Sequence, residues 1–455
     1  MRKEIKIFNL TSKRNTLIEV LKTSVPAVID LSSQTFTWLV EAILIGNLST
    51  AALAGVGISQ QIILLTFSIL LTFVVGSSII IARYLGVRDS WNANHILGQS
   101  LIIGIVLSII ISLIYYFGAP AIFTIIREEE PIARMYGIQY ITTIAWFTPL
   151  IVTNFIAIGI MRGTGDTLWS MKINVLVQII NLVLDILLIF GLLGFPRLET
   201  KGAGLAVGIA HSVGFFITLF VLRSRKANLF LAFMEVTRPN IKTFKRLIKM
   251  GIPTTIEQLV WSSGQLVMSI YAGWLGIVVL ATHQVFLRIQ GVITMIFFGF
   301  GLGSMSMIGK NLGAEQILQA RRTGMISGLI GFISAIFISS FLFLAANSIM
   351  SVFTNDVAVI GLGKSIMVLF VLIQLPKGAN IIFSGNLRGS ADLAWLMWLA
   401  IASSLLFEFL GAGMLAIYLG IGLAGIWIMA GVDELTRLSL NYWRFNRGKW
   451  KKIDL

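Results

Sequence analysis

Two carboxylates interrupt long apolar segments in the first half of the chain. Glu41 lies in one segment, and Asp185 ends a series in another, where Asn174, Gln178 and Asn181 precede it at spacings of four, three and four residues. Such spacings place side chains on one face of a helix. An ionised side chain in a bilayer costs about 2.5 to 3.5 kcal/mol and persists where it is paired, hydrated or functional. The pattern therefore makes Glu41 and Asp185 the first candidates for functional groups in this half of the chain.

Each of these groups also has a purely structural interpretation. Glu41 could reach water near the outer end of its helix, and the amides could join helices through hydrogen bonds. An amide stripe (Asn174, Gln178 and Asn181) that only joined helices would not need the charge of Asp185. The presence of that charge favours ion binding. Asn154, Asn174, Gln178 and His211 are further candidates for the site, although a lone helical histidine is more often a packing residue than a proton relay.

The second half of the chain has intramembrane charges of its own. They are Glu257, Lys377 and Glu408, and Glu257 occupies the repeat position of Asp30. We predict a buried ion-pair network between Lys377 and one or both glutamates, because removing either sign alone would leave a charge stranded in a low dielectric. The alternative is that these groups bind a charged part of a substrate.

The second half repeats the first at a nearly constant offset. Pro26 aligns with Pro253 at 227 positions, and Arg162 aligns with Arg388 at 226. Matched prolines and glycines imply matched helix bends and close approaches, and therefore matched three-dimensional units. Pro26 is the expected bend of the first helix.

The composition requires a bilayer around most of this chain. With 56% hydrophobic and 12% charged residues, a chain of 455 residues has too little polar surface for a soluble globule. We expect an all-α polytopic membrane protein whose halves, an N-lobe and a C-lobe, are parallel six-helix repeats around a central cavity. The twelve expected transmembrane helices are 17–46, 51–86, 93–118, 131–162, 166–192, 200–223, 245–273, 278–313, 320–345, 357–388, 392–418 and 421–446.

The distribution of basic residues orients the chain. Most of its 35 Lys and Arg fall in segments on the same side of the membrane as the N-terminus. The positive-inside rule therefore places both termini in the cytoplasm, and we expect the helices in the plasma (inner) membrane. The start of the chain is polar and basic and lacks the apolar core of a cleavable signal peptide. The expected parts are a cytoplasmic tail 1–16, the N-lobe 17–223, a cytoplasmic linker 224–244, the C-lobe 245–446 and a cytoplasmic tail 447–455.

Several function classes are excluded by the sequence. Orientation explains the net charge of +15, so we expect no nucleic-acid partner, while basic residues of the linker could contact anionic lipid. The chain has no cysteine for thiolate chemistry. It also has no HExxH, GxSxG or paired-histidine motif, so we expect no enzymatic activity and no cofactor other than a coupling ion.

A series of short motifs runs along the chain in a specific order. They are Pro26 with Glu41 and Gly46, Arg162-Gly-Thr-Gly-Asp166, Asn181-Leu-Val-Leu-Asp185, Lys201-Gly-Ala-Gly-Leu-Ala206, Leu280-Ala-Thr-His-Gln284, Arg388-Gly-Ser-Ala-Asp392 and Gly422-Leu-Ala-Gly-Ile-Trp427. Their order and spacing resemble the MATE (multidrug and toxic compound extrusion) transporters over nearly the whole chain. That family is a branch of the multidrug/oligosaccharidyl-lipid/polysaccharide flippase superfamily.

The resemblance implies a coupling site in the N-lobe. In the DinF-like branch the coupling ion is held by groups that match Glu41, Asn181 and Asp185, but the family threonine is Val207 here. In the NorM-like branch two carboxylates lie in the C-lobe. The matching positions of this chain are Trp261 and Lys377, so the resemblance argues against a C-lobe coupling site of that type. We expect coupling to H+ rather than Na+, because Na+ needs several oxygen ligands and Val207 removes one; Na+ at Glu41, Asn181 and Asp185 is the alternative.

The implied function is cation-coupled multidrug efflux by alternating access. The expected substrates are lipophilic, often cationic, organic compounds, and we expect the transporter to act as a monomer in contact with membrane lipid. The alternative is a flippase of lipid-linked oligosaccharides or lipids. Such a flippase is expected to line its cavity with several cationic residues, whereas Lys377 and Arg288 are the intramembrane basic residues here.

Overall fold

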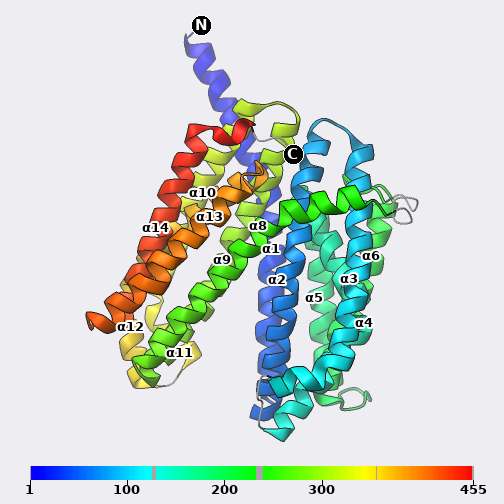
Figure 1. Cartoon of the computed structure of the whole chain (residues 1–455), viewed down its shortest axis with the longest axis vertical. Coiled ribbons are helices and arrows are strands. Elements are labelled where there is room, and N and C mark those ends of the chain that lie inside the picture. The colour runs from blue at the N-terminus through cyan, green and yellow to red at the C-terminus, as the bar shows by residue number, and fades with distance from the viewer. Residues whose placement is uncertain (1, 126–129, 232–238, 355, 453–455) are drawn as a thin grey trace. The chain divides into compact units, whose positions relative to one another are not determined.

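The computed structural model describes residues 2–125, 130–231, 239–354 and 356–452, with the side chains of 2–13, 347 and 452 left aside. Within these residues the secondary structure is helical, without strands (Figure 1). The helices of the first half are α1 (Arg2–Gly46), α2 (Thr50–Gly86), α3 (Ser90–Ile125), α4 (Pro131–Gly163), α5 (Thr167–Phe190) and α6 (Glu199–Arg223).

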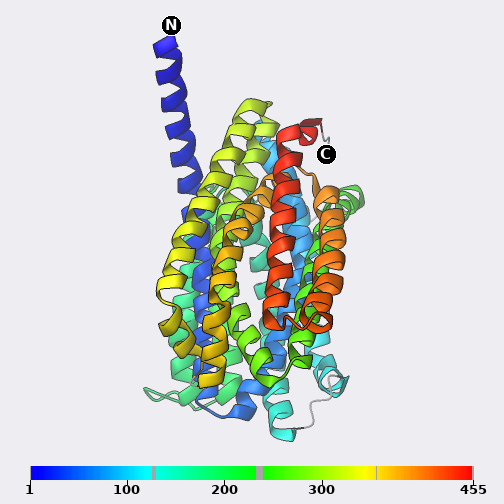
Figure 2. The same cartoon turned by 90° about the vertical axis from the view of Figure 1, so that its left-hand side faces the viewer.

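The second half contains the equivalent helices and several shorter elements. Its helices are α8 (Ile241–Trp274), α9 (Ile277–Gly313), α10 (Ile317–Leu344), α11 (Ala346–Phe353), α12 (Val357–Gly389), α13 (Leu393–Ser403), the π-helical η1 (Ser404–Gly411) and η2 (Met414–Tyr418), α14 (Leu423–Arg447) and the short 3-10 helix η3 (Lys449–Lys452). Figure 2 shows the last long helix, α14, beside α13.

The predicted all-α fold is confirmed, with a long helical segment at each of the twelve predicted positions in the described part of the chain. Ten of these segments are long and apolar enough to cross a membrane. The other two, α8 and α14, carry more charged residues. The prediction missed the short helix α11. It also took 392–418 as one regular helix, whereas the backbone changes to π-helical hydrogen bonding from Ser404.

Side-chain caps and turn residues set several helix boundaries. Ser49 accepts a hydrogen bond from the backbone nitrogen of Ala52 at 3.0 Å and begins α2. Glu130 accepts one from Ala133 at 3.1 Å, with Pro131 in the first turn of α4. Such caps satisfy backbone donors that have no partner within the helix. At the other end of a helix, Gly191 adopts a left-handed conformation (φ 72°) and ends α5.

The chain divides into two compact units, and the division falls inside two helices. One unit contains Met1–Val28 and Ile252–Leu455, and the other contains Ile29–Gly251. Helix α1 thus passes from the first unit into the second just after Pro26, and α8 passes from the second into the first just before Pro253. The predicted N-lobe and C-lobe boundaries, and the predicted bend at Pro26, remain predictions.

Corresponding helices pack in the same way in the two halves. Helix α4 packs on α2, α3 and α6, and α12 packs on α9, α10 and α14. Small residues permit this packing: a Cβ on Gly55 of α2 would overlap the backbone of α4 at Ala133, and Ser59 of α2 donates a hydrogen bond to the carbonyl oxygen of Gly137 at 2.9 Å. The repeated packing agrees with the repeat in the sequence.

Candidate functional site

Glu41 of α1 is buried against α4. Its side chain is 1% exposed, and its Oε1 accepts a hydrogen bond from the hydroxyl group of Tyr140 at 2.8 Å. Tyr140 is buried as well and belongs to an apolar cluster with Ile144 of α4 and Ile189 of α5. The interpretation that Glu41 reaches water is therefore wrong in this structure, because helices α4 and α5 cover its surroundings.

Asp185 of α5 is fully buried next to Asn181. The Nδ2 of Asn181 donates to Oδ2 of Asp185 at 3.3 Å, one helical turn along the chain. The other oxygens of both side chains, Oδ1 of Asn181 and Oδ1 of Asp185, are buried without a hydrogen-bond partner among the described residues. Buried oxygens are normally satisfied, so these two oxygens are candidate acceptors for a bound proton, cation or water.

Glu41 and Asp185 act on each other electrostatically, and neither has a basic partner within ion-pair distance in the described part of the chain. Two buried negative charges without a counter-ion are strongly unfavourable, so the two carboxylates are not both ionised unless a cation lies with them. The described residues contain no group of three or more His, Cys, Asp and Glu that could hold a metal ion. A metal cation here would need further oxygens from water or backbone.

The other candidates from the sequence divide between this site and structural roles. Asn174 contacts Asp30 rather than Asp185: its Nδ2 donates a hydrogen bond to Oδ1 of Asp30 at 2.6 Å. Asn154 of α4 accepts a hydrogen bond from Thr218 of α6 at 2.7 Å and joins the two helices. The amide stripe thus contains both a helix-joining contact at Asn174 and the Asn181–Asp185 contact.

Three further positions make no side-chain hydrogen bond among the described residues. Gln178 is buried on α5, and His211 is half-buried on α6. Val207 packs against the apolar cluster that contains Tyr140. The position that the DinF-like resemblance assigns to a threonine therefore presents a methyl surface near the candidate site.

An ion pair that the sequence analysis missed recurs in both halves. Asp30 of α1 accepts hydrogen bonds from Arg162 at the end of α4, with an Nη2 to Oδ2 distance of 2.8 Å. In the second half Glu257 of α8 accepts from Nη2 of Arg388 at the end of α12 at 2.7 Å. The repeat offsets of 227 and 226 relate the two pairs, so the aligned carboxylates and arginines were the signal that could have predicted them.

The predicted partners of Lys377 were wrong. Its Nζ lies 2.9 Å from Oε1 of Glu434 on α14, while Glu257 pairs with Arg388. Glu408 has no basic partner within ion-pair distance among the described residues. Lys377 and Glu434 face each other because α12 packs on α14, and that contact does not follow from the apolar pattern of either helix.

A polar cavity of about 80 Å³ lies among these second-half charges. Both members of two ion pairs line it, and the hydroxyl group of Thr294 and the Nε of Arg388 are buried there without a hydrogen-bond partner. A water needs roughly 10 to 15 Å³ of such volume, so the cavity is large enough for several waters or a small polar group. Its lining residues are Glu257, Gln258, Trp261, Thr294, Phe298, Lys377, Asn380, Ile381, Ser384, Arg388, Glu434 and Arg437.

The family model described as MatE matches the chain twice, over residues 26–187 and 253–412. The chain belongs to the MatE family. The two matched segments begin at Pro26 and Pro253, the prolines that the sequence repeat aligns. Members of the family are transporters and not enzymes, so this MatE protein is a multi-pass membrane transporter, and small molecules are its class of substrate.

Curated relatives and solved structures agree with that assignment. The chain is 25% identical to the "Uncharacterized transporter YisQ" of Bacillus subtilis over 93% of each chain. It is 26% identical to the "Probable multidrug resistance protein NorM" of Bacillus anthracis over 76% of this chain and 77% of that protein. A solved structure described as the outward-facing conformation of a multidrug resistance MATE family transporter has 22% identity and a TM-score of 0.87, covering 96% of this chain and 97% of that one.

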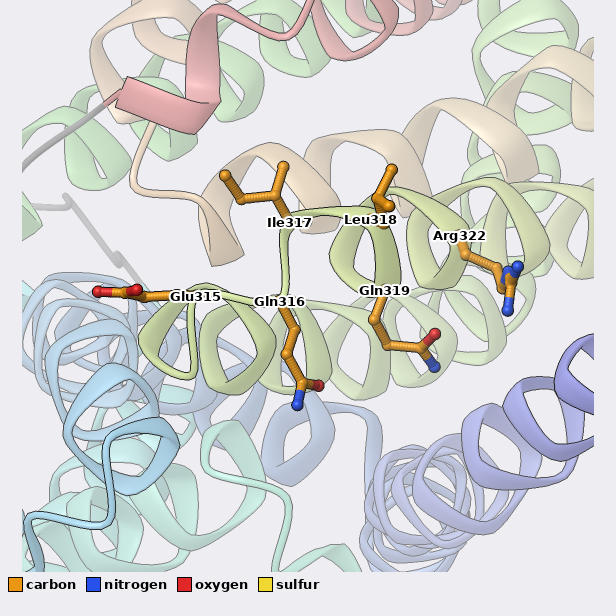
Figure 3. A pocket seen from close by; sticks show the side chains of 6 residues that line it. All are labelled: Glu315, Gln316, Ile317, Leu318, Gln319 and Arg322. Carbon is orange, nitrogen blue, oxygen red and sulfur yellow. The ribbon is translucent and has the colours of Figure 1, made fainter.

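A second pocket, at the turn between α9 and α10, does not have the character of a binding site in this MatE protein. Figure 3 shows that the side chains lining it diverge: Ile317 and Leu318 point to one side, whereas Gln316 and Gln319 point to the other. Gln319 donates to the hydroxyl group of Thr16 at 3.1 Å, a contact between α10 and α1. We therefore assign this turn a structural role.

Proposed function

We propose that the protein is a cation-coupled efflux antiporter that exports lipophilic, often cationic, organic compounds by alternating access. Family membership and the multidrug-resistance names of relatives such as NorM support this function. The observation that carries it is the buried pair of Glu41 and Asp185, two carboxylates without a counter-ion. A site that must bind a positive species in order to be stable is the element that ion-driven transport requires.

The coupling follows from neutralisation of this pair. With the pair empty, the two charges repel each other and disfavour closure of α1 on α4 and α5. A proton or cation removes that repulsion, so its binding changes the relative stability of two conformations. A positive charge that enters down the membrane potential contributes about 2.3 kcal/mol per 100 mV, which can drive export of a substrate against its gradient.

A proton is the better fit to the residues at this site. The described side chains offer the carboxylates of Glu41 and Asp185 and one free amide oxygen, that of Asn181. Na+ prefers several oxygen ligands, whereas a proton needs only a carboxylate. The methyl groups of Val207 stand where a hydroxyl group would add a ligand. We therefore propose H+ as the coupling ion.

Replacing Val207 by threonine tests this choice of ion. We expect Val207→Thr to strengthen Na+ binding several-fold and to leave H+-driven efflux near the wild-type rate, because the hydroxyl group adds one oxygen to a site that does not need it. Val207→Ala, which adds no oxygen, is the matched control. Stability against heating at increasing Na+ concentration measures the binding. Equal Na+ stabilisation of both variants would show that position 207 does not face the ion.

The cellular arrangement belongs to the same proposal. The basic residues favour both termini in the cytoplasm and helices in the plasma (inner) membrane, and nothing in the function requires more than a monomer. The basic linker between the halves could contact anionic lipid. We further propose that ion binding bends α1 near Pro26, since a proline removes one helical hydrogen bond.

The flippase alternative has less support from the second half of the chain. A lipid pyrophosphate would require several free cationic side chains. Lys377, Arg388 and Arg437 each pair with a carboxylate, and of the two intramembrane basic residues named from the sequence Arg288 alone has no ion pair among the described residues. Flux of a fluorescent lipophilic cation into everted vesicles, under separately imposed H+ and Na+ gradients, tests the proposed function. We expect H+-driven flux at equal Na+. Flux that responds to neither gradient would contradict antiport.

A further inference from the structure

Glu408 occupies an unusual backbone segment. It lies in η1 (Ser404–Gly411), where the helix widens from α-helical to π-helical hydrogen bonding, and its side chain is 3% exposed. The hydroxyl group of Tyr271 on α8 donates to the carbonyl oxygen of Phe409 at 2.6 Å and fixes this segment. Such π-helical turns are rare and occur frequently at functional sites.

The carboxylate of Glu408 is pressed against α8 and is incompletely bonded. A Cβ on Gly264 would overlap its Oε2, so α8 comes this close because residue 264 has no side chain. The same oxygen is buried and makes no hydrogen bond among the described residues. Glu408 therefore places a carboxylate oxygen in an apolar contact, where an ionised form is unfavourable.

Each other acidic side chain near the polar cavity has its own basic partner. Glu257 pairs with Arg388 and Glu434 pairs with Lys377, at 2.7 and 2.9 Å. Asp433 pairs with Nε of Arg437 at 3.0 Å. These pairs use every basic side chain that lines the polar cavity, so Glu408 is left as the carboxylate in excess.

The charged neighbours of Glu408 do not remove this excess. Asp433, Glu434 and Arg437 of α14 act on it, two of them with like charge. The hydroxyl group of Ser404 bonds to its carboxylate, and α8 faces it with Gly264. Arg437 is already held by Asp433 and also donates to the hydroxyl groups of Ser403 and Ser404, at 2.7 and 2.8 Å. A proton on Glu408 is the remaining way to balance the buried charge.

We propose that Glu408 is a second proton-binding site, in the second half of the chain and separate from Glu41 and Asp185. Arg437 lines the polar cavity and contacts the start of η1, so it connects the Glu408 segment with that cavity. When Glu408 loses its proton, the negative charge competes with Asp433 for Arg437. The use of this proton in transport rests on the proposed function, whereas its binding does not.

Stability against heating, measured over a range of pH, tests the protonation of Glu408. Glu408→Gln keeps the shape of the protonated acid, so we expect a Tm equal to wild type at mildly acidic pH and above wild type at alkaline pH. Asp433→Asn is the matched control: it removes the partner of Arg437 and should lower Tm at every pH. A Glu408→Gln variant that is destabilised like Asp433→Asn would show that Glu408 is ionised, and would overturn the proposal.

Infrared spectroscopy separates this proposal from the one at the first-half site. Buried protonated carboxyl groups give C=O bands that ionised ones lack. We expect the variant with Glu41→Gln and Asp185→Asn to retain one such band, and addition of Glu408→Gln to remove it. If that band survives the third substitution, Glu408 does not hold the proton. Bands lost only with the first two substitutions would support the coupling site and reject the Glu408 site.

Discussion

Asp185→Asn is expected to reduce ion-coupled efflux to the background of empty vesicles while the protein still folds. The substitution keeps the shape of the side chain and removes the charge that, with Glu41, must be neutralised by the coupling ion. Since Asp185 has no basic partner in the described part of the chain, its neutralisation strands no cation. We therefore expect a Tm equal to or above that of wild type.

Asp30→Asn is the matched control for this experiment, because it neutralises a buried carboxylate that Arg162 and Asn174 hold. Its expected result is the reverse: lower thermal stability, with ion dependence retained in the fraction that remains folded. Both variants are measured for efflux of a fluorescent cation and for Tm. Wild-type transport by Asp185→Asn would rule out this residue as part of the coupling site.

Lys377→Ala is expected to destabilise the protein by about 3 to 5 kcal/mol, the range for breaking a buried ion pair from one side. The lysine is 4% exposed, and its removal leaves Glu434 without its ion-pair partner and with the amide of Asn380 at 2.8 Å as its hydrogen-bond partner. Adding Glu434→Gln should recover part of the loss, because the stranded charge disappears. Thermal or denaturant unfolding of the two single variants and the double variant gives the coupling energy.

Glu257→Gln combined with Lys377→Ala supplies the control for that cycle. Glu257 belongs to a different ion pair, with Arg388, so its neutralisation should add to the loss rather than reverse it. If Glu257→Gln rescued Lys377→Ala and Glu434→Gln did not, the pairing seen in the structure would be wrong and the pairing predicted from the sequence would be right.

The fold could be predicted from the sequence because the apolar segments are long and the chain repeats itself. Bilayer-spanning helices are marked by length and hydrophobicity alone, and the alignment of Pro26 with Pro253 indicated that the two halves contain corresponding helices. Ends were less accurate. Helix α1 begins at Arg2, because it continues through polar residues, and α3 continues through Pro120 and a mostly apolar stretch to Ile125. The π-helical stretch from Ser404 was not predictable, because it depends on hydrogen-bond register rather than on residue type.

The burial of the candidate site residues could be predicted from the sequence but their contacts could not, and their role in ion binding remains a prediction. Glu41, Asn181 and Asp185 stand out as polar groups in apolar segments, and the structure buries all three. Tyr140 gave no such signal, because a tyrosine is common in apolar helices, and its bond to Glu41 depends on how α4 packs on α1. The ion pair of Lys377 with Glu434 depends in the same way on how α12 packs on α14.

Proton release on substrate binding tests the central claim most directly. A lipophilic cation is added to the purified protein in weakly buffered solution without Na+, and a pH indicator records the protons released. We predict release from the wild-type protein and loss of most of it in the variant with Glu41→Gln and Asp185→Asn, whose Tm shows that it is folded. Undiminished release from that variant would contradict the claim that Glu41 and Asp185 hold the coupling ion.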